Sequence, residues 1–307
     1  MKTKTPGNRR HKSIPALLIA GLVALPGLVQ GQPSAHYVPG SEGIKAATLP
    51  PPGFYLRDYN LFYDASQLND AHGNKIDAAG ADAFVYANVP RLLWITETKV
   101  LGGYLGVDAL LPIEYTSLQV NTPAGRFSDQ TFGIGDFFAE GTWSAHPDHF
   151  DFALAAGFWA PTGDSSPFLT TRAGAGYWTA MLTAGATWYI DHDKQWAVSA
   201  LNRYEFNSEK NDTDITPGQV YTLEWGVSRT FMKTWDVGAV GYYQQQVTGT
   251  TGTGTSGELG RVAGVGPEIS AFFPKIMLGV SFRYVYEFMA ESRLQGQTFT
   301  LTLTKRF

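Results

Sequence analysis

The last eleven residues of the chain, Gln297 to Phe307, read QTFTLTLTKRF and alternate between apolar and hydroxyl-bearing side chains. Successive side chains of a β-strand point to opposite faces of the sheet. Phe299, Leu301 and Leu303 therefore share one face, and the threonines between them share the other. The pattern predicts a strand with one apolar surface and one polar surface.

The same alternation recurs in residues 100–115, 174–190 and 276–289, where large apolar side chains fill one face. In 174–190 that face includes Trp178 and Trp188, ten positions apart. At about 3.3 Å per residue and a tilt near 40°, ten residues rise roughly 25 Å, the separation of the two aromatic girdles of a membrane barrel. We therefore expect Trp178, Trp188 and the terminal Phe307 at the membrane interface. Two tryptophans buried in a soluble core are the alternative.

Candidate strands follow one another at regular spacing after residue 52. Twelve are expected, at 53–64, 82–96, 100–115, 131–145, 150–160, 174–190, 195–206, 219–232, 236–247, 262–273, 276–289 and 297–307. An open sheet cannot lie in hydrocarbon because its edge N–H and C=O groups are unpaired, whereas a closed barrel pairs them all. We therefore predict an all-β fold, a closed antiparallel up-and-down transmembrane β-barrel of about 12 strands, an even number as such barrels require.

The connections expected between these strands alternate in length. Tight turns at 97–99, 146–149, 191–194, 233–235 and 274–275 alternate with long polar segments at 65–81, 116–130, 161–173, 207–218, 248–261 and 290–296. Outer-membrane barrels have short periplasmic turns and longer extracellular loops. The alternation predicts that both chain termini lie on the periplasmic side. A soluble β-sandwich, the alternative for amphipathic strands, has no reason to sort its loops in this way.

The composition excludes several other classes of protein. Charged residues make up 16% of the 307 positions and aromatic residues 14%, which fits neither a disordered chain nor a helical bundle. The net charge of -4 and the lack of a long basic run give no electrostatic footprint for nucleic acid. The chain has no cysteine, so disulfides, thiol nucleophiles and thiolate metal sites are absent.

The N-terminal region has the parts of an export signal. Basic residues precede an apolar stretch from Ile14 to Val29, which ends at a small-residue cleavage site before Gln32. The stretch is short of the roughly 20 apolar residues of a transmembrane anchor, the alternative assignment. We predict a signal peptide at 1–31, a periplasmic N-terminal segment and partial plug at 32–52, and an outer-membrane β-barrel at 53–307. The triple proline before residue 53 is stiff and extended, which suits a plug.

Inward-facing positions carry more acids than bases. The lumen-lining candidates are the acids Asp108, Glu114, Asp136, Glu140, Glu205, Glu224, Glu268 and Glu287, the arginines Arg203 and Arg283, and the aromatic residues Tyr104 and Trp159. Buried charges must be paired or solvated, so eight acids against two arginines predict a hydrated lumen. Its field would favour cations or polar neutral solutes over anions. Alternatively, the acids are internal struts hydrogen-bonded to hydroxyl groups.

Signatures of an enzyme are scarce. All six histidines lie outside the expected strands, so a strand-borne Ser/His pair would have no general base. The polar clusters at 146–149 and 191–193 have the length of turns, and neither has the ligand spacing of a zinc site. We therefore expect no catalytic residue, no cofactor and no metal.

Residues 41–55, SEGIKAATLPPPGFY, are the most distinctive segment of the chain. With VPRLLW at 89–94, GIGD at 133–136 and APTGD at 160–164, they resemble the bacterial family named for the meta-pathway of phenol degradation. The resemblance covers essentially the whole mature chain. It implies an outer-membrane channel or transporter for small aromatic or hydrophobic compounds, and it supplies no catalytic residues.

The expected location is the bacterial outer membrane, and the expected partners are outer-membrane lipid, a small-molecule substrate and the barrel-assembly machinery. The last of these follows from the C-terminal strand, which ends in phenylalanine and resembles the assembly signal of outer-membrane barrels. Two other functions stay open at this point. One is a membrane-embedded barrel hydrolase, and the other is a structural barrel without transport.

Overall fold

The computed structural model describes residues 35–76, 80–122, 125–165 and 171–307, so the signal peptide predicted at 1–31 lies outside the described residues. In the described part of the chain, no helix has the length and apolar character needed to cross a membrane. The elements are β1 (Gly53–Leu68), β2 (Gly80–Val100), β3 (Gly103–Leu110), β4 (Ile113–Thr122), β5 (Gly125–Ile134), β6 (Phe137–Ala145), β7 (Phe150–Ala160), β8 (Thr179–Tyr189), β9 (Trp196–Asn207), β10 (Val220–Phe231), β11 (Trp235–Gln246), β12 (Arg261–Phe273), the 3-10 turn η1 (Pro274–Ile276), β13 (Leu278–Glu291) and β14 (Leu294–Arg306).

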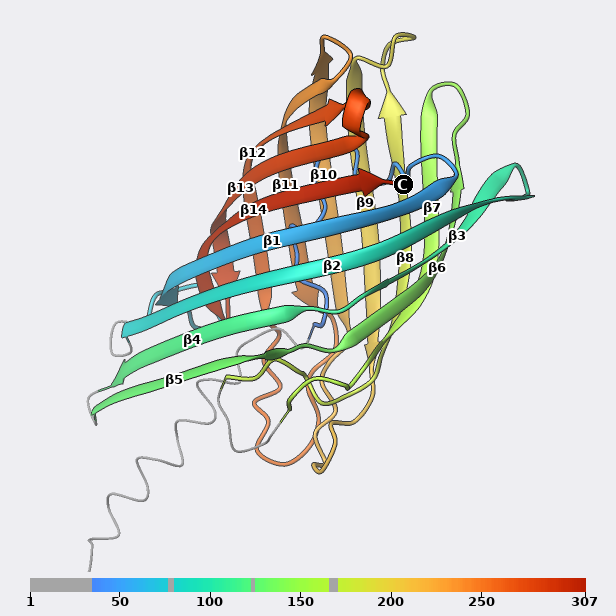
Figure 1. Ribbon diagram of the computed structural model, residues 1–307. Helices are drawn as coiled ribbons and strands as arrows, with labels where there is room; N and C mark the ends of the chain where they lie inside the picture. The colour runs from blue at the N-terminus through green and yellow to red at the C-terminus, as the bar shows by residue number, and fades with distance from the viewer. Residues whose placement is uncertain (1–34, 77–79, 123–124, 166–170) are drawn as a thin grey trace, which may run out of the picture.

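The strands form a closed antiparallel barrel (Figure 1). Its circuit of twelve strands runs β1, β2, β3 and then β6 through β14, and returns to β1. The first and last strands pair along their whole length, from Tyr55 opposite Arg306 to Leu68 opposite Leu294. The predicted closed barrel of about 12 strands is therefore confirmed.

Two further strands, β4 and β5, form a hairpin that extends from this circuit (Figure 1). Strands β3 and β4 pair with β2 in one register, since Arg91 lies opposite Leu110 and Asn88 opposite Ile113. Pro112 lies in the break between β3 and β4, where its missing N–H cannot support a ladder. The hairpin corrects the sequence prediction at 116–130, which is strand and not a long loop.

The connections otherwise differ in length at the two ends of the barrel. Residues 101–102, 146–149, 190–195, 232–234 and 274–277 connect strands at the rim near the C-terminus, here called the short-turn rim. The longer connections, which follow β1, β7, β9 and β11, begin and end at the opposite rim, here called the long-loop rim. The loop predicted at 290–296 is an exception, because only residues 292–293 separate β13 from β14. Polar composition alone does not distinguish a loop from a strand with a polar face.

The barrel is apolar outside and charged inside. Outward side chains such as Leu182 and Phe288 are more than half exposed, whereas Glu205, Glu224 and Arg283 are buried. Within the described residues, no other part of the protein covers these exposed apolar side chains. An outward apolar band of this kind is typical of barrels that lie in lipid.

The three aromatic residues expected at the membrane interface all point outward. Trp178 precedes β8 and Trp188 lies near its other end, and both are about half exposed. The ring of Phe307 lies 5.9 Å from that of Phe54 at the short-turn rim. Their place at the interface remains a prediction.

Candidate functional site

Residues 36–48 pass through the inside of the barrel (Figure 1). His36 contacts Thr179, the first residue of β8, and Thr48 contacts Thr187 near the end of that strand. The segment therefore runs from the long-loop rim to the short-turn rim. The sequence predicts a periplasmic segment and partial plug at 32–52, and residues 36–48 of this range lie inside the lumen.

His36 anchors the segment near the long-loop rim. Its Nε2 lies 2.9 Å from Asp136 Oδ2 and its Nδ1 lies 2.7 Å from Thr179 Oγ1. The imidazole stacks on Trp159, with ring centroids 5.4 Å apart. Asp136 lies beside the break between β5 and β6 and also accepts the backbone N–H groups of residues 163 and 175. One carboxylate thus connects the segment, the strand break and the loop at 161–178.

The backbone of the segment donates hydrogen bonds to three carboxylates of the inner wall. Glu205 accepts from residues 36 and 37, Glu224 from residues 40 and 42, and Glu268 from residue 44, at 2.9–3.1 Å. Gly43 fits against Glu268 because it has no side chain, since an added Cβ would collide with the Glu268 carboxylate. These acids bind the segment and are not free in the lumen.

Arginines form ion pairs with several acids of the inner wall. Arg91 binds both carboxylate oxygens of Asp108 at 2.8 Å and one of Glu140 at 2.6 Å. A bidentate arginine–carboxylate pair is among the strongest charged hydrogen bonds. Two further pairs are Arg203 with Glu224 at 2.5 Å and Arg283 with Glu268 at 2.8 Å.

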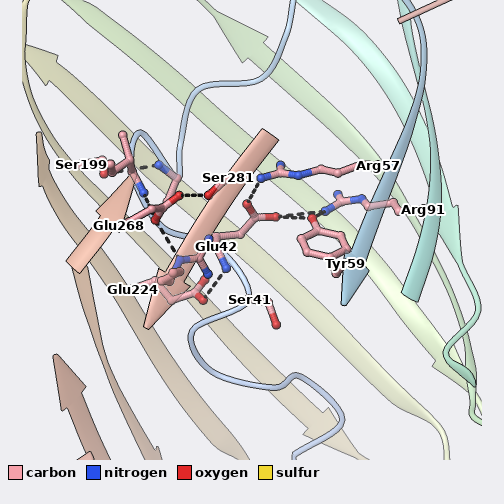
Figure 2. A network of polar contacts seen from close by, with 12 residues as sticks. Ser41, Glu42, Arg57, Tyr59, Arg91, Ser199, Glu224, Glu268 and Ser281 are labelled. Atoms are coloured by element: carbon pink, nitrogen blue, oxygen red, sulfur yellow. Dashed lines mark hydrogen bonds and ion pairs between the residues drawn. The ribbon is translucent and has the colours of Figure 1, made fainter. Parts of the chain in front are cut away.

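Glu42 reaches from the segment to the opposite wall, where β1 and β2 face it (Figure 2). Its Oε2 lies 2.8 Å from Arg57 Nη2, and its Oε1 lies 3.4 Å from Arg91 Nη1. Tyr59 donates its hydroxyl to the same Oε1 at 2.7 Å. Nearer the short-turn rim, Lys45 forms an ion pair with Asp236 at 2.8 Å. Side-chain charges of both signs therefore fasten the segment.

The structure places the predicted lumen residues as follows. Glu114 and Tyr104 are half-buried, and the others are buried. Glu287 lies 3.9 Å from Arg293 Nη2 and accepts hydrogen bonds from the hydroxyls of Tyr63 and Tyr242. That these residues line an open pore remains a prediction.

The sequence argument missed Arg57 and Arg91, and it therefore overstated the surplus of acids. Both could have been found from alternation, because Arg57 lies between inward-facing Tyr55 and Tyr59, and Arg91 is two residues before buried Leu93. The hydrogen bonds from the backbone N–H groups of residues 36–44 to the wall could not be predicted, because they follow no sequence pattern. Within the described residues, no group of three or more His, Asp or Glu side chains is arranged to hold a metal.

Comparison with known proteins agrees with this architecture. The family described as the MetA-pathway of phenol degradation matches residues 65–303. An outer-membrane channel from Pseudomonas putida F1 is similar with a TM-score of 0.76 at 15% sequence identity, over 89% of this chain and 100% of that one. The transport unit of the autotransporter AIDA-I from Escherichia coli has a TM-score of 0.51 at 9% identity, over 87% and 94% of the two chains. No curated protein matches the sequence significantly. At such identities, the solved structures show a shared fold.

Proposed function

The chain belongs to the MetA-pathway of phenol degradation family, and from that premise we propose that it is a channel of the bacterial outer membrane for small aromatic or hydrophobic compounds. The observation that carries the proposal is a closed barrel, apolar outside, whose charged lumen holds a non-covalently bound segment of the same chain. A structural barrel would be filled by its own wall side chains and would need no such segment. The P. putida channel with the same fold supports this function.

Residues 35–52 act in this proposal as a plug that blocks the lumen until it is displaced. Hydrogen bonds and ion pairs to the wall hold this segment, and water can replace such contacts when the segment leaves.

Aromatic side chains support the proposed substrate class. Tyr37, Phe138, Trp159 and Met181 form one buried apolar cluster in the lumen, and Tyr37 belongs to the plug. When Tyr37 leaves, the rings of the wall become available to stack on a flat apolar solute. The description of the family, which refers to phenol degradation, agrees with such a solute.

Planar bilayers and liposomes test this function. We expect the mature protein to give brief channel openings and a variant lacking residues 35–49 to give larger and longer ones. Liposomes with this variant should take up phenol faster than glucose, because the stacking surface favours aromatic solutes. An absence of conductance in both proteins, with phenol uptake equal to that of empty liposomes, would contradict the proposal.

A further inference from the structure

One arginine of the lumen has no counter-charge on the barrel wall. In the described residues, the only salt-bridge partner of Arg57 is Glu42, which belongs to the N-terminal segment. The other arginines around it pair with acids of the wall, namely Arg91 with Asp108 and Glu140, Arg203 with Glu224, and Arg283 with Glu268. When the segment leaves, the other three arginines keep an acid of the wall as partner, whereas Arg57 keeps none. An unpaired and partly buried charge is unfavourable, so the emptied position attracts an anion.

The surroundings of Arg57 have the geometry of a carboxylate site. Arg57 and Arg91 lie directly opposite each other on β1 and β2, where like charges repel unless an acid bridges them. The two oxygens of Glu42 provide that bridge, and the Tyr59 hydroxyl donates to one of them (Figure 2). Arg57 Nε is also buried without a hydrogen-bond partner, so the guanidinium has spare donor capacity. Guanidinium groups match the planar geometry of a carboxylate.

An apolar surface adjoins this site. Tyr55 and Leu93 form the next cross-strand pair on the inner face toward the short-turn rim, and they pack with Ile95 in one buried cluster. Leu49 of the N-terminal segment covers this cluster. Displacement of the segment therefore exposes an apolar surface beside the two arginines at the same moment.

We propose that Arg57, Arg91 and Tyr59 form a binding site for small aromatic carboxylates, which Glu42 occupies while the segment is docked. Glu42 and Leu49 then mimic the two parts of such a ligand, its carboxylate and its ring. The proposal rests on the proposed function only in requiring that the segment can leave. It assigns aromatic acids to a channel whose surplus of acids would otherwise favour cations.

The carboxylate part of the site is tested by chemical rescue of Glu42→Ala in the full-length protein. This substitution removes a CH2–COO⁻ group, and acetate has the same heavy atoms. Thermal unfolding in detergent should occur at lower temperature in the variant than in the wild type. Acetate should restore it at concentrations about tenfold lower than acetamide needs, because only acetate supplies charged hydrogen bonds. The double variant Glu42→Ala/Arg57→Gln should show no rescue.

The result that would overturn the site is rescue by acetamide or chloride as effective as rescue by acetate, or rescue that persists without Arg57. If Glu42→Ala does not fold, the isosteric Glu42→Gln in combination with Ser41→Cys serves instead, since the chain has no native cysteine. Benzoate should then displace the segment and speed maleimide labelling of the cysteine at position 41 several-fold, while benzamide should not. Equal effects of the two compounds would overturn the proposal.

Neither readout requires solute flux. A protein that conducts no solute but shows acetate rescue would refute the channel and leave the carboxylate site standing. A conducting protein without rescue would refute only the site.

Discussion

Replacing Gly43 by alanine should push the N-terminal segment out of its place in the lumen. A methyl carbon at this position would overlap the Glu268 carboxylate and lie 2.5 Å from Arg283 Nε. Non-bonded heavy atoms need about 3.5 Å. Either the carboxylate swings away or the segment retreats, and both movements break contacts that hold the plug.

The free-energy cost follows from the contacts that are lost. Rotation of the carboxylate disrupts its 2.8 Å ion pair with Arg283, and breaking a buried pair costs about 3–5 kcal/mol. Retreat of the segment instead loses hydrogen bonds to charged acceptors, including the 2.9 Å bond from Ile44 N to Glu268, each contributing about 1.5–3 kcal/mol. At the lower end of this range, two such bonds amount to about 3 kcal/mol. The docked state would become about 100-fold less favoured, because 1.4 kcal/mol is a factor of ten.

Single-channel recording in planar bilayers measures this shift as a rise in open probability. Ser41→Ala is the matched control, because among the described residues the Ser41 hydroxyl donates only to Val38 O of the same segment. We expect the control to behave as the wild type does. A Gly43→Ala protein with the open probability and unfolding temperature of the wild type would refute the reasoning.

Three further substitutions test the wall of the barrel. Arg91→Gln leaves two buried carboxylates without their cation and should destabilise the protein by about 3–5 kcal/mol, measured by urea unfolding; an unchanged midpoint would contradict the ion-pair assignment. Leu154→Arg, on the outward face, should cost about 2–4 kcal/mol in lipid bilayers and more than Leu154→Ala, and equal costs would mean that this face does not contact lipid. Gly163→Ala brings a Cβ within 2.8 Å of the Gly174 backbone and should speed proteolysis of the loop at 161–178. The control Gly141→Ala should not change proteolysis, because among the described residues its added methyl meets nothing within 4 Å.

Alternation along the chain was sufficient to predict the wall. Period-two patterns in residues 276–289 and 297–307 identify strands and their outward faces, because side-chain direction in a strand depends only on sequence position. The same rule places Arg203, Glu224 and Arg283 inside. It failed at 116–130, where polar side chains on an exposed hairpin resemble a loop.

Alternation could not predict what fills the lumen. Residues 36–49 have no strand period, and their place depends on backbone N–H groups meeting carboxylates that lie 168 to 224 positions away in sequence.

The amino-acid sequence by itself determined that this chain closes into a barrel, apolar outside and charged inside, because that follows from the order of neighbouring side chains. Only the tertiary structure decided that Glu42 meets Arg57 and Arg91. Closure of the sheet brings the inner faces of distant strands around one volume, and the partner of a charge in that volume depends on strand register and on the path of the enclosed segment.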